Sequence, residues 1–233
     1  MEDGFFRLHN ELPREGPGEP DDVRWAVDCA RVKPGARILD AGSGPGGDIG
    51  TLLEVEGAHV TAVDAHGPFV AAIRDRFPPD RVTAVEGDMS VQEGPFDFIW
   101  CAGALYFLGV AAGLAAFRGR LAVGGAIAFS EPCLFTDDAS EEARAFWEGY
   151  VARPRDELLE EVEAAGYRVL GDRRLSDAAW EAYYAPLLER ARRLRGDAGP
   201  EVTPALDMAE AEASLWRKVK RETGYLLVVA RPV

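Results

Sequence analysis

The 233-residue sequence predicts an α/β fold in which helices cover both faces of a largely parallel sheet. Two observations support this fold class. Short apolar or β-branched runs alternate with segments of helical periodicity between residues 36 and 131. A glycine-rich turn at residues 42–47 follows the first apolar run, as strand-to-helix turns do in doubly wound sheets. The length suits one domain with a sizeable core.

The predicted elements follow one another in the order expected for such a sheet. The first twenty residues are rich in proline and glycine and predict an irregular arm, and a helix starts near Asp21-Asp22. Strands are predicted over residues 37–41, 59–63, 82–86, 96–101 and 126–130. Apolar residues at helical spacing predict helices around residues 49–53, 69–77 and 110–121.

The pattern changes after Pro132. A helix rich in aromatic residues is predicted near 146–150, and a second helix over 158–165 ends at Gly166. A strand over 167–170 precedes a polar, mostly helical segment at 176–222, which Pro186 and a loop at 196–204 interrupt. The last predicted strand spans 225–230.

Composition disfavours several classes of function. Forty acidic residues against 26 Lys and Arg give a net charge of −14, which would repel a nucleic-acid backbone. The cysteines Cys29, Cys101 and Cys133 have neither disulfide-framework nor zinc-site spacing, and the three histidines have no ligand partners at metal spacing. No signal-peptide pattern or long apolar run occurs. We therefore expect a cytoplasmic protein without a metal, a membrane partner or a nucleic-acid partner.

The glycine-rich turn is compatible with two kinds of cofactor. Gly42, Gly44 and Gly47 satisfy a dinucleotide-binding pattern, whereas Asp40, Gly42, Gly44 and Gly46 satisfy the turn that binds S-adenosylmethionine (SAM). A pyrophosphate would lie near the like charge of Asp40, while SAM has a net positive charge. Charge therefore favours SAM.

With these motifs, the chain resembles the class I SAM-dependent methyltransferases, in particular the small-molecule group similar to the ubiquinone and menaquinone biosynthesis enzymes. The resemblance is strongest between residues 36 and 131. It implies a Rossmann-like, doubly wound, seven-stranded sheet, mostly parallel, whose last strand is antiparallel. One domain would comprise an N-terminal arm and helix (1–35), a cofactor-binding core (36–175), a helical insertion (176–222) and the last strand (223–233).

The resemblance assigns cofactor roles to residues that follow the early strands. The first motif would bind the methionine part of SAM, Asp64 with Ala65 would contact the ribose, and the residues after strand three would contact the adenine. The cofactor-binding residues implied in this way are Asp40, Gly42, Ser43, Gly44, Gly46, Asp64, Ala65, Asp88, Met89, Cys101 and Ala102. A carboxylate that accepts from two neighbouring hydroxyl groups supports the ribose role of Asp64 independently. An alternative role for Asp64 is to cap the next helix.

Candidates for contact with the methyl acceptor lie after strands four and five. Tyr106 and Glu131 are the catalytic and substrate-binding candidates, and burial would raise the pKa of Glu131 towards that of a useful base. A capping role for Glu131 and a core position for Tyr106 are the alternatives. In related enzymes the arm and late insertions roof the acceptor pocket, so Trp180, Tyr183, His9 and Asn10 are further substrate-binding candidates. Trp180 and Tyr183 also fit a stripe that packs onto the domain.

The predicted reaction is an in-line transfer of the SAM methyl group to a small-molecule acceptor, with S-adenosylhomocysteine (SAH) as the product. Most of the acceleration would come from positioning, and a base is needed only when the acceptor carries a proton. Two alternatives remain, an NAD(P)-dependent oxidoreductase that uses the same turn and a non-catalytic SAM-binding module. The sequence leaves open the acceptor atom and oligomeric state, including a possible homodimer.

Overall fold

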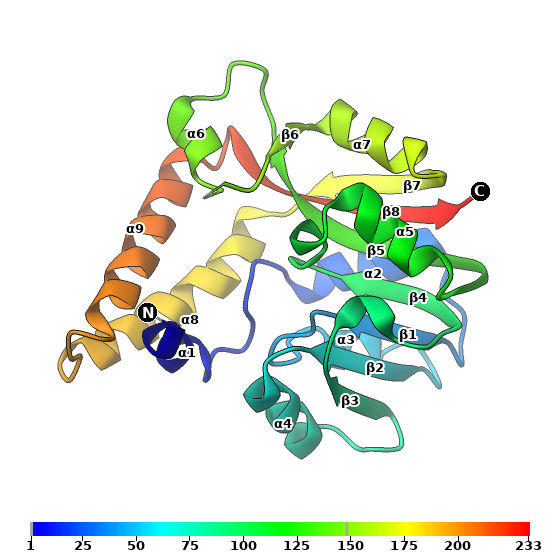
Figure 1. The fold of residues 1–233 in the computed structure, drawn as a ribbon, viewed down its shortest axis with the longest axis horizontal. Coiled ribbons are helices and arrows are strands. Elements are labelled where there is room, and N and C mark those ends of the chain that lie inside the picture. Colours follow the sequence, from blue (N-terminus) through cyan, green and yellow to red (C-terminus); the bar gives the residue numbers. More distant parts are fainter. Residues whose placement is uncertain (1, 148) are drawn as a thin grey trace.

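A computed structural model describes residues 2–147 and 149–233, and its centre is one twisted sheet (Figure 1). Seven strands follow the order β3-β2-β1-β4-β5-β8-β7, and the two-residue strand β6 pairs with β5 outside this path. The strands are β1 (Arg37–Ala41), β2 (His59–Asp64), β3 (Val82–Glu86), β4 (Phe96–Cys101), β5 (Leu121–Leu134), β6 (Arg153–Pro154), β7 (Tyr167–Arg174) and β8 (Thr223–Pro232).

The strand directions confirm the predicted fold class. β1 pairs in parallel with β2 on one side and with β4 on the other. β2 pairs in parallel with β3, and β4 pairs in parallel with β5. The last strand, β8, is antiparallel to both of its neighbours, β5 and β7. Because the parallel strands share one direction, the carboxyl ends of β1 to β4 meet at the same edge of the sheet.

Helices cover the two faces of the sheet. On one face lie α2 (Pro20–Ala30), α3 (Ile49–Leu52) and α4 (Gly67–Arg76), and on the other lie α5 (Val110–Arg118) and α7 (Arg155–Ala164). Each layer buries its own apolar cluster, with Ile38 and Phe98 in one and Leu39 and Ile99 in the other. Adjacent strand residues therefore point to opposite faces, as the twofold period of a strand requires.

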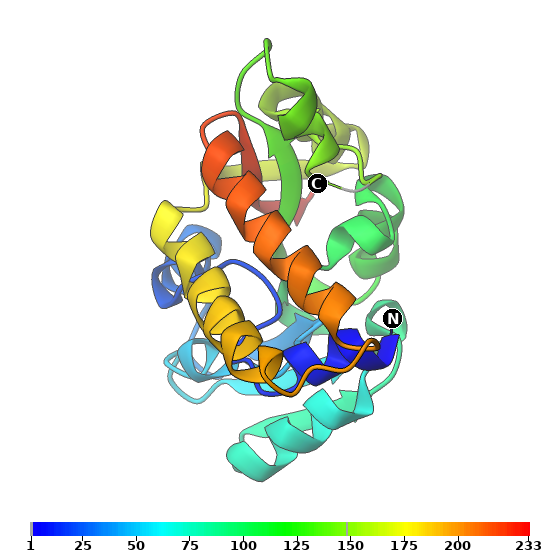
Figure 2. The same ribbon diagram turned by 90° about the vertical axis from the view of Figure 1, so that its left-hand side faces the viewer.

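Three further helices stand beyond the carboxyl ends of the parallel strands. These are α1 (Glu2–His9), α8 (Asp177–Arg195) and α9 (Thr203–Val219), which gather on the left of Figure 1 and face the viewer in Figure 2. The ring of Trp180 on α8 stacks on Trp216 of α9 at 5.2 Å and on Tyr225 of β8 at 5.4 Å. Aromatic packing thus fixes the predicted helical insertion to the sheet.

The structure corrects several predicted boundaries. The arm is not irregular throughout, because α1 occupies its first residues. The helix predicted over 110–121 ends at Arg118, and Leu121 instead begins β5 and pairs with Phe96, so its helical spacing was coincidental. The predicted strand at 126–130 continues to Leu134 because the long strand β8 pairs along this part of it.

The aromatic-rich helix predicted near 146–150 is also wrong. The helix α6 spans Glu141–Ala145, and the aromatic residues follow it in a turn. Phe146 and Trp147 pack against Trp180, at ring distances of 5.9 and 6.2 Å, so tertiary packing explains their apolar pattern. The sequence also predicted an interruption at Pro186, but α8 continues through this residue as one helix.

Candidate cofactor and acceptor site

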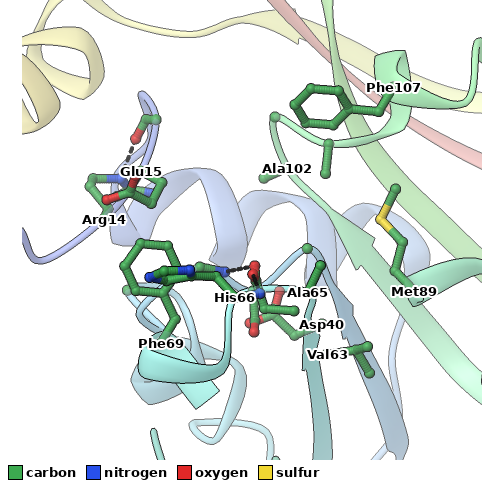
Figure 3. A pocket seen from close by; sticks show the side chains of 18 of the residues that line it. Arg14, Glu15, Asp40, Val63, Ala65, His66, Phe69, Met89, Ala102 and Phe107 are labelled. Atoms are coloured by element: carbon green, nitrogen blue, oxygen red, sulfur yellow. Dashed lines mark hydrogen bonds between the residues drawn. The ribbon is translucent and has the colours of Figure 1, made fainter. Parts of the chain in front are cut away.

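A cavity of about 1290 Å³ lies at the carboxyl ends of β1 to β4. Its floor comes from the residues that follow these strands, and its roof includes Arg14 and Glu15 of the N-terminal arm (Figure 3). Tyr106 and Tyr225 line the side towards β5 and β8. A cavity of this size accommodates a cofactor together with a second small molecule.

The glycine-rich turn brings main chain to the cavity wall. The amides of Gly42 and Ser43 both donate to the Val63 carbonyl at 2.9 Å, which ties the turn to β2. Gly42 has a φ of 74°, and a Cβ at this position would lie 2.5 Å from the Cβ of Ala104. The turn therefore requires glycine at position 42 both for its conformation and for close approach.

Asp40 places a buried carboxylate under this turn. The residue is 4 % exposed, lines the cavity, and has one carboxylate oxygen, Oδ2, without a hydrogen-bond partner among the described residues. Burial raises the pKa of Asp40 well above its usual range, and the nearby charges of Asp48 and Asp64 raise it further. A positively charged ligand would compensate this group, whereas a pyrophosphate would not.

Asp64 ends β2 with both carboxylate oxygens fixed. Oδ2 accepts from the Gly44 amide and Oδ1 accepts from the His66 amide, each at 2.8 Å. Each oxygen keeps a second lone pair for a ligand hydroxyl group. Asp88, after β3, accepts from the amide and hydroxyl of Ser90 at 2.7 Å, and these hydrogen bonds lower the pKa of Asp88.

The N-terminal arm is attached across the cavity by polar and aromatic contacts. The Phe6 ring stacks on the His66 ring with a centroid distance of 3.8 Å and an interplanar angle of 3°, and the His66 Nε2 pairs with Asn10 Oδ1 at 3.0 Å. Arg14 donates to both oxygens of Asp48, at 3.0 and 3.2 Å. These contacts position the arm as a cover over the strand ends.

The two catalytic candidates lie in different surroundings. Tyr106 lines the cavity, and burial raises its pKa to about 12. Glu131 is 2 % exposed, does not line the cavity, and has an Oε1 atom without a hydrogen-bond partner in the described chain. Burial raises the pKa of Glu131 to about 8, Arg153 opposes this shift, and Glu161 adds to it.

Strand alternation explains the position of Glu131. Its neighbours at two-residue spacing, Phe129 and Cys133, belong to the apolar cluster under α5 and α7. Trp180 and Tyr183 belong to the cluster on the other side of the sheet. Trp180 and Tyr183 are therefore on the opposite side of the sheet from Phe129 and Cys133, the strand neighbours of Glu131.

The structure brings most of the predicted cofactor residues to one cavity. Those that line it are Asp40, Gly42, Ser43, Gly44, Asp64, Ala65, Asp88, Met89, Ala102 and the acceptor candidate Tyr106. The predicted residues outside the lining are Gly46, Cys101, Glu131, His9, Asn10, Trp180 and Tyr183. The functional roles of both groups remain predictions.

The residues outside the lining have structural surroundings that account for their positions. A Cβ on Gly46 would meet Ile49 and Ile73, so this glycine faces the packed helices. Cys101 is fully buried. His9 Nδ1 pairs with the carboxylate of Glu15 at 2.8 Å, and Asn10 pairs with His66. Both residues therefore contact side chains that line the cavity without lining it themselves.

The sequence-based reasoning missed several lining residues, among them Arg14, Glu15, His66, Phe107 and Tyr225. His66 follows the predicted ribose acid by only two positions, which was a usable signal. The arm residues and Tyr225 have no such signal, because they reach the cavity only through the packing of distant segments.

Comparisons with known proteins agree with this geometry. The family model described as "Methyltransferase domain" matches residues 38–125, which hold the glycine turn, the strands β1 to β4 and the start of β5. This part of the chain is similar to that domain. The match agrees with the predicted family and with the prediction of an enzyme. No curated protein matches the chain.

Solved structures share the fold over the whole length of this chain. A SAM-dependent methyltransferase from Geobacter sulfurreducens, crystallised with SAH, has a TM-score of 0.87 at 23% identity and covers 100% of this chain and 99% of its own. A SAM-dependent methyltransferase from Thiobacillus denitrificans, also with SAH, has a TM-score of 0.85 at 21% identity and 98% coverage of both chains. YJHP from E. coli has a TM-score of 0.84 at 22% identity and 99% coverage of both.

In the described part of the chain, no helix combines the length and apolarity needed to cross a membrane. The same residues contain no cluster of His, Cys, Asp or Glu arranged to hold a metal ion.

Proposed function

We propose that this protein transfers the methyl group of SAM to a small-molecule acceptor. The observation that carries the proposal is the arrangement of Asp40, Asp64 and Asp88 around one cavity at the ends of β1, β2 and β3. The methyltransferase domain match and the two SAH-containing neighbours support the same cofactor.

The residues present fit SAM chemically. Asp40 offers a buried carboxylate oxygen without a partner in the described chain, which suits a cationic ligand. Asp64 offers free lone pairs beside the Gly44 amide, which suits a pair of ribose hydroxyl groups. Met89 and Phe69 line the cavity from different sides (Figure 3), and either could offer apolar surface to a purine ring. When bound, SAM would supply an activated methyl group on a sulfonium.

The contribution of the chain itself is positioning and exclusion of water. The arm covers the strand ends through the Phe6–His66 stack and the Arg14–Asp48 pair. Tyr106 and Tyr225 line the acceptor side of the cavity, where they would hold the acceptor against the methyl group. Holding two reactants in line at near-contact distance supplies about 7–11 kcal/mol in well-oriented systems, so the reaction needs no covalent catalysis.

A titration with four ligands tests the proposal. We expect SAM and SAH to bind by isothermal calorimetry and to raise the melting temperature, and NADH and NADPH to do neither. Stabilisation by a nicotinamide nucleotide alone would instead favour the oxidoreductase reading. Binding of SAM without methyl transfer to any acceptor in a broad panel would favour the non-catalytic module.

A single variant then tests the site. Asp64→Asn keeps the shape of the side chain but replaces one acceptor oxygen, so we expect SAH affinity to fall about tenfold or more, in line with about 1.5–3 kcal/mol for a hydrogen bond to a charged group. The matched control is Asp97→Asn, because Asp97 accepts from the Arg37 amide at the opposite end of the sheet. Unchanged SAH affinity in Asp64→Asn would remove this residue from the site.

A further inference from the structure

The cavity has a marked excess of negative charge. Six carboxylates line it, namely those of Glu15, Asp40, Asp48, Asp64, Glu86 and Asp88. Arg14 is the one Lys or Arg among the described residues of the lining, and its guanidinium is occupied by Asp48 and by the carbonyl of Gly16 at 2.6 Å. A phosphate- or carboxylate-bearing acceptor would therefore meet repulsion without a free cation to offset it.

Glu15 supplies a carboxylate that the predicted cofactor contacts do not use. Its side chain is 21% exposed, and its Oε2 atom pairs with His9 Nδ1 at 2.8 Å. The other oxygen, Oε1, is buried without a hydrogen-bond partner among the described residues. Its Cγ atom lies 3.3 Å from the position that a Cβ on Gly44 would take, so Glu15 lies directly over the glycine turn.

Aromatic side chains form the opposite part of the cavity. The Tyr106 ring lies 4.5 Å from the Phe107 ring and 6.3 Å from the Tyr225 ring, measured between centroids. Phe107 lines the cavity across from Arg14 and Glu15 (Figure 3). Aromatic faces opposite a carboxylate are the combination that binds organic cations, because the ring quadrupole and the carboxylate both attract positive charge.

We infer that the acceptor half of this cavity, between Glu15 and the rings of Tyr106, Phe107 and Tyr225, binds an organic cation and that the methyl acceptor is an amine. This inference rests on the proposed function. The protonated amine first loses a proton to water. Its nitrogen lone pair then forms the N–C bond as the S–C bond to the methyl group breaks, and that bonding pair stays on sulfur. The product is a more substituted, positively charged amine.

A pair of probes with one shape and different charge tests the inference on protein saturated with SAH. The cation is [4-(hydroxymethyl)phenyl]trimethylammonium, and its uncharged isostere is 4-tert-butylbenzyl alcohol. We expect the cation to bind at least tenfold more tightly in a ligand-observed NMR titration. Equal binding of the two probes, or binding of neither, overturns the inference while leaving the proposed function in place.

Binding of SAH is measured first in the same samples by calorimetry, so the two claims fail separately. Absence of SAH binding overturns the proposed function, and with it the inference that rests on it. A turnover panel of amines, matched alcohols and matched carboxylic acids completes the test. We expect SAH formation with amines, and turnover confined to alcohols or acids overturns the inference.

Two variants locate the cation. Glu15→Gln removes the charge and keeps the shape, so we expect the preference for the cation over its isostere to fall about fivefold or more. The control Glu11→Gln makes the same change on the same arm, outside the cavity, where the exposed Glu11 side chain pairs with Arg190. It should leave the preference unchanged. An equal preference in Glu15→Gln and the unmodified protein removes Glu15 from the cation site.

Discussion

Glu131 gives the sharpest prediction on stability, because its carboxyl group is buried with one oxygen unpartnered in the described chain. Its pKa rises from an ordinary value of 4.5 to about 8 in the folded protein. Between pH 4.5 and about pH 8, Glu131 keeps its proton in the folded protein but has lost it in the unfolded chain. The contribution of Glu131 to stability is therefore complete below pH 4.5 and is lost as the pH rises through about 8.

The size of this loss follows from the pKa difference. A difference of about 3.5 between 4.5 and 8, at about 1.4 kcal/mol for each pKa unit, gives an upper limit of about 5 kcal/mol. The Glu131→Gln variant keeps the shape of the side chain and cannot ionise. We expect the free energy of unfolding of this variant, relative to the unmodified protein, to increase by up to about 4 kcal/mol between pH 5 and pH 9, because part of the loss already occurs below pH 5.

Urea denaturation at a series of pH values, followed by circular dichroism, measures this difference directly. The comparison between variant and unmodified protein cancels the pH dependence of all other groups. Glu157→Gln on α7 is the matched control, because Glu157 is exposed and its loss should leave the curve parallel to that of the unmodified protein. A stability difference for Glu131→Gln that stays constant from pH 5 to pH 9 would refute the reasoning.

Two further predictions concern the cofactor half of the site. Gly42→Ala should lower the free energy of unfolding by about 1–3 kcal/mol and abolish SAH binding in calorimetry, because of its positive φ and the 2.5 Å approach to Ala104. Gly50→Ala, where a Cβ meets nothing within 4 Å, should preserve both properties. Phe6→Ala removes the stack on His66, which is worth about 0.5–1.5 kcal/mol. We therefore expect SAH release, measured by stopped flow, to become about two- to tenfold faster. An unchanged release rate would show that the arm does not cover bound SAH.

The sequence predicted the strand ends well because the relevant signals are local. A buried strand, a terminal acid and a turn are encoded within a few residues, so Asp40 and Asp64 could be placed at the cavity before its shape was known. Parallel strands then bring their ends together by topology alone. Asp88 was assigned through the family resemblance, because the turn at Gly87-Asp88 is unremarkable by itself, and it lines the same cavity.

Other features depended on tertiary packing that no short window contains. Leu121 has helical spacing after Phe117, yet its pairing with Phe96 makes it part of β5. Trp180 has the pattern of a lid residue, but it stacks on Trp216 and Tyr225 and lies outside the cavity lining. In both cases an apolar residue fits two environments, and the distant partner decides between them.

The two halves of the cavity therefore differ in how their residues are encoded. The cofactor half is built from short segments that directly follow β1, β2 and β3. The acceptor half combines Glu15, Tyr106 and Tyr225, which come from an arm, a loop and the last strand. Tyr106 and Tyr225 lie outside the glycine turn, so substitutions there can change the acceptor surface without altering that turn. Because fold similarity alone does not identify the acceptor, the acceptor must be argued from the charge and aromatic surface of this chain.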